Sequence, residues 1–273
     1  MKRKRKLALI VNAVMIIMAV MWLLPMLWMF MASVDPSANV FTKLPSGITM
    51  QNFASVLKSH TNQMSFLNSL VLSFGVAILV IICSGLAGYA LSRYEMKYKK
   101  SFLMTVLFMS SLPGTVLIVP VYRMFVTLKL NDSLGGIILF MAATTLPYSL
   151  WMMKNFMDSV PLYLEEAASV DGAGTWQRIR RIVVPLMIPG TFCVAIQAFI
   201  GAWGNFMVPF ILLKSAGKYP AAVTMYQYIG MWDISYGELT AFSILYAVPV
   251  LFLYVLGQNY MSKGFSMSGA GKG

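Results

Sequence analysis

Long apolar runs alternate along the chain with short polar segments that hold most of its charged residues. A helix needs about 20 mainly apolar residues to cross the hydrocarbon core of a bilayer. Six runs reach this length, at about residues 7–32, 66–92, 101–123, 134–153, 187–213 and 239–261. The pattern predicts an all-α membrane protein, with six transmembrane helices in a single transmembrane domain over residues 1–273.

Helix-breaking residues within these runs predict irregular helices. Proline lacks the amide hydrogen that an α-helix needs, so kinks are expected at Pro113, Pro120, Pro147 and Pro249. Pro189 and Gly190 predict an irregular first turn in the fifth span.

Residues 161–185, between the fourth and fifth runs, form the longest polar segment after residue 62 whose residues suggest more than a connecting loop. The segment contains two adjacent acids, an Asp-Gly turn signal and three arginines. Pro161 suits the first turn of a short helix and Gly172 suits its end. Thr175 suits the N-cap of a second helix that runs to about Val184. Two short amphipathic helices at a turn predict a projecting knob; the alternative is an ordinary loop lying on the membrane surface.

Basic residues set the orientation of the spans, because Lys and Arg are enriched in cytoplasmic loops. With the N-terminus inside, the inner segments carry 15 of the 21 Lys and Arg residues and the outer segments carry six. Both termini and the 161–185 segment are therefore expected in the cytoplasm. The basic start resembles a signal peptide, but its apolar run of 26 residues exceeds a cleavable core of roughly 7 to 15 and predicts an uncleaved first span.

Composition narrows the class of protein. Charged residues make up 11% of the chain and the mean hydropathy is +0.73, whereas soluble domains carry about 25% charged residues. The net charge of +12 lies in short groups between apolar runs, which is typical of cytoplasmic loops and argues against nucleic acid as a partner.

Asp, Glu, Lys, Arg and His are missing from the six predicted spans, apart from Arg123 at a boundary. Proton- and ion-driven carriers usually retain such groups as their relay, so any coupling energy is expected to enter from outside the bilayer. The tail from Gly264 has the glycine spacing of a phosphate-binding loop, but Ala270 stands where the lysine is required. The chain is therefore expected to bind no ATP and no other cofactor. The single histidine, His60, has no Cys or His neighbour, so no metal site is expected. With one histidine and no carboxylate in the spans, no nucleophile and base can be paired, so the chain is expected to be no enzyme by itself.

Uncharged polar residues at membrane depth are the candidates for a translocation path. Trp203 and Asn205 would suit a neutral polyol through stacking and hydrogen bonds, and Gln197 lies on the same predicted span. The alternative is helix packing held by one amide. On a continuous helix Trp203 lies about 200° from Asn205, which favours Asn205 as the pathway residue.

The 161–185 segment resembles the EAA loop of ABC-importer permeases. Its matching pattern is Glu166-Ala167-Ala168, three residues, Gly172, nine residues, Ile182, one residue, a branched aliphatic residue and Pro185. Val184 departs from the family, which usually has Leu there.

Four further stretches are similar to the carbohydrate-uptake (MalG-type) branch of this family. They are Asn68-Ser69, residues 87–93, residues 203–205 and the closing residues 269–273, where Gly271 replaces the usual Val. The resemblance implies one of two non-identical permease subunits, assembled with two ATPase subunits that bind ATP and Mg²⁺ and with an extracytoplasmic sugar-binding protein. It also implies a multi-pass protein of a bacterial or archaeal cytoplasmic (inner) membrane, in contact with lipid, that imports a sugar or oligosaccharide.

The same resemblance assigns coupling to the ATPase to one set of residues, namely Glu165, Glu166, Ala167, Ala168, Asp171, Gly172, Ile182 and Pro185. The helix 165–172 would dock into a cleft of an ATPase subunit, with Glu166 facing basic residues there. Two alternatives stay open: the same architecture for another neutral or cationic solute, and a membrane scaffold or secondary carrier without an ATPase.

Overall fold

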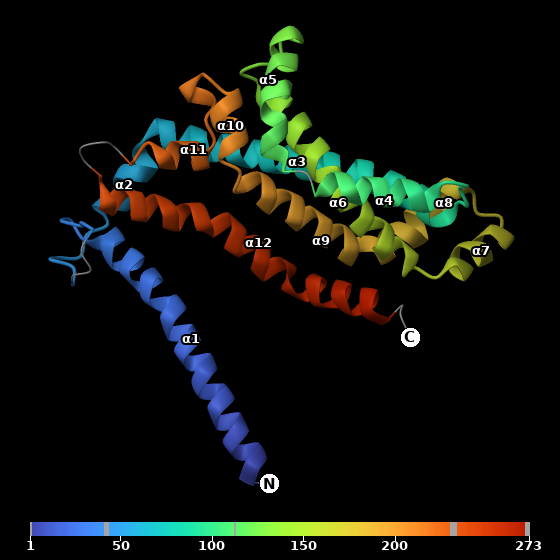
Figure 1. Ribbon diagram of the computed structural model, residues 1–273, viewed down its shortest axis with the longest axis horizontal. Coiled ribbons are helices and arrows are strands. Elements are labelled where there is room, and N and C mark those ends of the chain that lie inside the picture. The colour runs from blue at the N-terminus through green and yellow to red at the C-terminus, as the bar shows by residue number, and fades with distance from the viewer. Residues whose placement is uncertain (1, 41–43, 112, 230–233, 271–273) are drawn as a thin grey trace. The chain divides into compact units, whose positions relative to one another are not determined.

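The computed structural model describes residues 2–40, 44–111, 113–229 and 234–270, and within these residues its regular elements are all helices, joined by turns and irregular segments (Figure 1). The elements are α1 (Lys2–Val34), α2 (Gln51–Lys58), α3 (His60–Arg93), α4 (Lys99–Ser110), η1 (Gly114–Leu117), α5 (Ile118–Thr127), α6 (Leu134–Asp158), α7 (Leu162–Val170), α8 (Thr175–Arg178), η2 (Ile179–Val183), α9 (Val184–Trp203), α10 (Met207–Leu212), η3 (Ala216–Lys218), α11 (Ala221–Tyr226) and α12 (Tyr236–Ala270).

Five of these helical segments are long and apolar enough to cross a membrane. They are Leu9–Val34, His60–Arg93, Leu134–Asp158, Thr175–Trp203 and Tyr236–Gln258. Each contains most of one predicted span, so the prediction of an all-helical membrane protein is confirmed. α6 and α12 continue through Pro147 and Pro249.

The predicted third span, 101–123, is wrong as a single helix. The chain forms Lys99–Ser110 and then Gly114–Thr127, and the two segments are bent by 84° relative to each other. Pro113 precedes η1 with an extended backbone (φ −62°, ψ 122°), because a proline interrupts the hydrogen bonding of the preceding helix. The bent pair forms either a broken span or a re-entrant segment.

The fifth span also differs from its predicted bounds. Helix begins at Thr175, so the second knob helix and the fifth span are continuous, and it ends at Trp203 instead of residue 213. The irregular turn is not at Pro189 but at the π-helix Ile179–Val183, where the Val184 amide donates to the Ile179 carbonyl. Pro185 follows at once, and a wider turn relieves the clash of its ring with the preceding carbonyls.

The described residues form two compact units. The first comprises residues up to Gln63 together with Thr224–Val248. Its core includes Val56 and Phe242, which are fully buried. Asn62 ties it together, since its side-chain amide donates to the Val56 carbonyl at 2.9 Å and to the Tyr228 hydroxyl at 2.7 Å.

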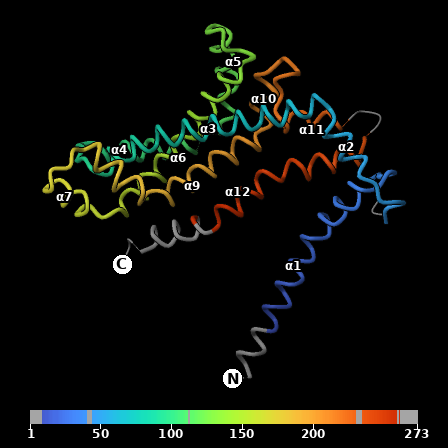
Figure 2. Tube along the Cα trace, turned by 180° about the vertical axis from the view of Figure 1, so that it is seen from behind, coloured from blue at the N-terminus to red at the C-terminus, as the bar shows by residue number. Residues whose placement is uncertain are grey.

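The second unit comprises Met64–Val223 together with the described residues from Pro249 onward. Within it α4, α6 and α9 lie alongside one another, α7 lies at one end, and α5 projects away from the bundle in both views (Figures 1 and 2). A glycine permits the close contact of α6 with α9: a Cβ on Gly190 would lie 2.6 Å from the Phe156 ring. Small residues at such crossings let membrane helices pack without losing contact area.

A hydrogen-bonded carboxylate closes the second unit at the end that carries α10. Asp132, in the turn before α6, accepts bonds from the Ser215 hydroxyl at 2.6 Å and from the amides of Lys214 and Ser215 at 2.9 and 3.1 Å. The Lys218 ammonium donates to it at 2.9 Å. These donors, Ser215 first, hold the pKa of the Asp132 carboxyl well below its usual range.

Replacement of Asp132 by Asn is expected to release residues 214–218. Hydrogen bonds to a charged acceptor contribute about 1.5–3 kcal/mol, so amide exchange of this segment at pH 7 should rise about tenfold or more. Hydrogen exchange followed by mass spectrometry measures it, with Glu95→Gln, at an exposed carboxylate, as the control. Unchanged exchange in Asp132→Asn would show that the contacts do not hold the segment.

The lowered pKa also sets the pH dependence of this contact. A depressed carboxyl pKa stabilises the folded state above the unfolded pKa of about 3.9, and this contribution is lost as the pH falls below that value. Protection of residues 214–218 in the unsubstituted protein should therefore stay constant from pH 8 to about pH 5.

Candidate functional site

The knob, residues 161–185, begins with the helix α7. Pro161 has an extended backbone (ψ 126°) and serves as the N-cap, so Leu162 rather than Pro161 is the first helical residue. Two bonds close the other end: the Ala173 amide donates to the Ala168 carbonyl at 2.9 Å, and the Gly172 amide donates to the Ser169 carbonyl at 3.1 Å. This pair is the Schellman arrangement, which requires a left-handed residue.

Gly172 supplies that left-handed residue, with φ +81°. The prediction that Gly172 ends the first helix is confirmed. The second helix starts one residue away from its expected cap, because Gly174 takes the N-cap position and Thr175 is the first helical residue.

The two adjacent acids of α7 differ in burial. Glu165 is 3% exposed and accepts a 2.6 Å bond from Arg93 Nε and a 3.0 Å bond from the Tyr89 hydroxyl. Glu166 is exposed. Of the pair assigned to the partner-facing surface, only Glu166 is therefore available on the surface, whereas Glu165 fixes α7 to the end of α3.

The outer side of the knob is apolar as well as charged. Val170 is 89% exposed and Trp176 is 72% exposed, on either side of the Gly172 turn. A hollow of about 400 Å³ lies between the two helices, and it is lined by Ala168, Asp171, Gly172, Ala173, Gln177, Arg178, Arg181 and Ile182. Four of the predicted coupling residues thus line one depression, while Ala167 and Pro185 lie on the exposed surface nearby.

Sequence reasoning missed Tyr89 and Arg93 as parts of this site. They stand four residues apart at the end of α3, and such a spacing places them on one face of the helix. The signal available in the sequence was this pair of polar residues at helical spacing, together with an acid, Glu165, in the later polar segment that needed a partner. Their partner lies 72 residues later for Arg93, and only the fold brings them together.

The candidate pathway residues have different surroundings. Trp203 is 3% exposed and stacks on Phe199 with ring centroids 5.7 Å apart, so its ring belongs to the core of this chain. Asn205 follows the end of α9. Its side-chain oxygen accepts the Val208 amide at 3.0 Å and so satisfies one amide in the first turn of α10, whose N-cap is Phe206. The prediction that Asn205 lies on a continuous fifth helix is wrong, because the helix ends at Trp203.

Two side-chain amides of the second unit, Gln197 and Asn205, offer NH₂ donors. Asn205 is half-buried, and its NH₂ group has no bond to the described residues. Gln197 is also half-buried and accepts the hydroxyl of the buried Ser149 at 3.1 Å, which leaves its NH₂ group available. Both can donate to a polar, uncharged ligand.

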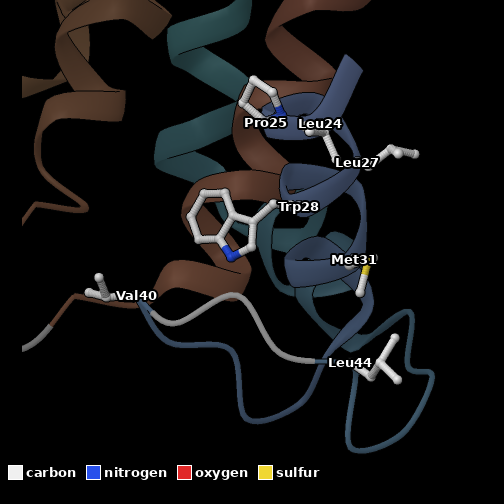
Figure 3. A pocket seen from close by; sticks show the side chains of 7 residues that line it. All are labelled: Leu24, Pro25, Leu27, Trp28, Met31, Val40 and Leu44. Atoms are coloured by element: carbon white, nitrogen blue, oxygen red, sulfur yellow. The ribbon is translucent and has the colours of Figure 1, made fainter. Parts of the chain in front are cut away.

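A larger hollow in the first unit has different chemistry. It measures about 750 Å³ and lies between α1 and the segment that follows it (Figure 3). Its lining is Leu24, Pro25, Leu27, Trp28, Met31, Val40 and Leu44. Apart from the Trp28 indole, no side chain of this set offers a hydrogen bond, so the hollow suits an apolar neighbour such as lipid or another helix instead of a hydroxylated solute.

Comparisons with known proteins find similarity to transport proteins over most of the chain. Residues 81–265 match the family described as the binding-protein-dependent transport system inner membrane component. The chain is 29% identical over 267 residues to the diacetylchitobiose uptake system permease protein NgcG of Streptomyces coelicolor, covering 96% of this chain and 88% of that protein. It is 28% identical over 249 residues to the trehalose transport system permease protein SugB of Mycobacterium tuberculosis, covering 90% of each.

Among solved structures, the chain is similar to one from a bacterial ABC transporter that imports the acidic polysaccharide alginate. The TM-score is 0.82 and the identity is 22%, covering 95% of this chain and 98% of that chain. At this identity the likeness establishes a shared fold.

The Gly172 turn provides a test of the knob geometry with a matched control. A Cβ has open space at both Gly172 and Gly174, but only Gly172 has a positive φ; Gly174 has φ −68°. Gly172→Ala should destabilise the end of α7 by about 1–2 kcal/mol, because an L-residue is strained in this region. Gly174→Ala should leave it unchanged or slightly stabilised.

Hydrogen exchange of the Ala173 amide measures this local opening. The expected rise in Gly172→Ala is about five- to thirtyfold, from the same energy difference. Equal exchange in the two variants would contradict the left-handed turn.

Proposed function

Because this chain belongs to the family of binding-protein-dependent transport system inner membrane components, we propose that it is the permease subunit of an ATP-driven sugar importer. The observation that carries the proposal is similarity over nearly the whole chain to permeases of diacetylchitobiose and trehalose uptake systems. The chain is a multi-pass inner-membrane transport component and not an enzyme. The proposed substrate is a sugar or short oligosaccharide.

The proposed complex contains this chain, a second and different permease subunit, two ATPase subunits that bind ATP and Mg²⁺, and an extracytoplasmic sugar-binding protein. The family description supports the binding protein, since transport by its members depends on one. The distribution of Lys and Arg supports a cytoplasmic knob with both termini on the same side. An ATPase is a cytoplasmic partner, so the knob is the surface on which we place it.

The exposed side of the knob has the composition of a docking surface. Val170 and Trp176 provide apolar anchors, and Glu166 with the arginines of the second helix provides a charged rim. Interfaces commonly combine a few aromatic or apolar anchors with a polar rim that excludes water. This arrangement supports coupling to the ATPase through the face that carries Glu166. Glu165 would contribute indirectly, by bonding α7 to α3.

A neutral solute fits the second unit better than a cation. The predicted spans hold no carboxylate that would neutralise a cationic substrate, and charges inside a membrane need such a partner. The side-chain amides of Gln197 and Asn205 offer donors suited to hydroxyl groups. A permease of the same architecture for another neutral solute is the second candidate.

The central test is sugar uptake into proteoliposomes that contain the complex purified with its own partners. Sugars eluted from the co-purified binding protein serve as substrates, and uptake should require both ATP and the loaded binding protein. Trp176→Ala should weaken retention of the ATPase about thirtyfold, because loss of an interface hot spot costs about 2 kcal/mol.

A tryptophan of equal exposure provides the control for this variant. Trp22 on α1 is 71% exposed, against 72% for Trp176, and Trp22→Ala should keep the ATPase bound. Full ATPase retention by Trp176→Ala would show that the knob is not the docking surface. ATP-independent uptake by the unsubstituted complex would contradict the proposed function as an ATP-driven importer.

Asn205 is expected to act on the transported solute through its NH₂ group. Asn205→Ser keeps an oxygen that can accept the Val208 amide but removes the NH₂ donor, whereas Asn205→Leu removes both. Loss of a side-chain bond to an amide in the first turn of a helix costs about 1 kcal/mol, so only Asn205→Leu should lower the yield of the complex. Both variants should slow sugar uptake at equal amounts of complex. Normal uptake by Asn205→Ser would restrict Asn205 to its bond with the Val208 amide.

A further inference from the structure

We infer that the last turn of α3 clamps the elbow between α6 and α7, so that α3 moves with the ATPase-docking helix. The elbow clamp is defined as Tyr89, Ser92 and Arg93 on α3 together with Asp158, Val160 and Glu165. The inference rests on the proposed function, and it adds a route by which motion of the knob reaches the membrane. The three residues of α3 are positioning residues, because they act through Glu165 and the elbow.

The clamp consists of direct hydrogen bonds across the elbow. The Arg93 guanidinium donates to Glu165 at 2.6 Å and to the Val160 carbonyl at 3.0 Å. The Tyr89 hydroxyl donates to the other oxygen of Glu165 at 3.0 Å, and the Ser92 hydroxyl donates to Asp158 at 2.6 Å. One turn of α3 is thereby bonded to the end of α6, to the connecting turn and to α7.

The geometry of Arg93 leaves it little freedom to swivel. Its Nε, Nη1 and Nη2 groups each have a separate acceptor, namely Glu165, Ser92 and Val160. The side chains of Arg93 and Glu165 are 9% and 4% exposed. A planar guanidinium with fixed donor directions holds several acceptors in one arrangement, and screening by water is weak at this burial.

Close packing of α3 on α6 supports the same junction. A Cβ on Gly88 would lie 3.3 Å from the Lys154 amide nitrogen and 3.3 Å from the Met153 side chain. Lys154 also pairs with Asp158, which is the acceptor of Ser92. The end of α3, the end of α6 and the start of α7 are therefore packed and bonded as one junction.

Chain connectivity explains why this junction matters for transport. α7 is covalently continuous with α6 on one side and with the α8–η2–α9 helix on the other. α3 ends far earlier in the sequence, so its direct attachment to α7 is made by the hydrogen bonds of Tyr89 and Arg93 to Glu165. A displacement of α7 by the ATPase reaches α3 directly through these bonds, in addition to the packing of α3 on α6 at Gly88.

The test measures the number of ATP molecules hydrolysed per sugar imported by the complete transporter in proteoliposomes. Arg93→Ala and Glu165→Gln should keep ATP hydrolysis stimulated by the loaded binding protein but lower uptake about tenfold, which lies within the range of typical coupling between sites. Tyr89→Phe, which removes one hydroxyl only, should raise the ratio less. Lys100→Ala, at an exposed basic residue near the same helix end, should leave the ratio unchanged.

A charge exchange separates a mechanical link from a general loss of folding. The double variant Arg93→Glu with Glu165→Arg should bring the ATP-to-sugar ratio back toward that of the unsubstituted complex. The inference is overturned if the single variants keep the normal ratio, if hydrolysis and uptake fall in parallel, or if the exchange restores nothing. ATP-driven uptake by the unsubstituted complex would leave the proposed function intact in each of these cases.

Discussion

Charged groups are costly in the hydrocarbon core of a bilayer, and this constraint decides where the chain places its strong polar contacts. The predicted spans contain almost no charged residues. The directional bonds therefore gather at the ends of the second unit, around Glu165 at one end and Asp132 at the other. Between them, packing at small residues such as Gly190 brings the helices together.

Two of the stretches that resemble sugar permeases make hydrogen bonds between segments that are distant in sequence. Ser69 accepts the Ala221 amide at 2.7 Å, and Asn68 donates to the Gly217 and Tyr219 carbonyls at 2.9 and 3.2 Å. Tyr89 and Arg93 belong to the stretch 87–93 and bind Glu165. The similarity in these stretches thus falls on side chains that tie distant segments together.

The two acids of α7 have different surroundings in the knob. Glu165 is buried against α3 and makes the helix part of a bonded junction, whereas Glu166 remains on the exposed surface near the two apolar anchors Val170 and Trp176. A rigid inner attachment and an exposed outer face are both needed if a partner is to move a helix bundle through a small element. In the proposed coupling, this attachment would keep the motion of α7 from being absorbed within the knob.

Much of the architecture follows from the sequence, because apolar runs and turn residues act locally. Five spans, the short helix α7 and its end at Gly172 could be predicted from length, composition and glycine chemistry. A kink at Pro113 was predicted, but only the tertiary structure decided that it divides the span with a bend of 84°. The tertiary structure alone also decided the π-turn before Pro185 and the end of the fifth helix at Trp203, since a helix breaker permits several outcomes and neighbouring helices select one. It also decided which of two adjacent acids is buried, because the partner Arg93 is distant in sequence and adjacent only in the fold.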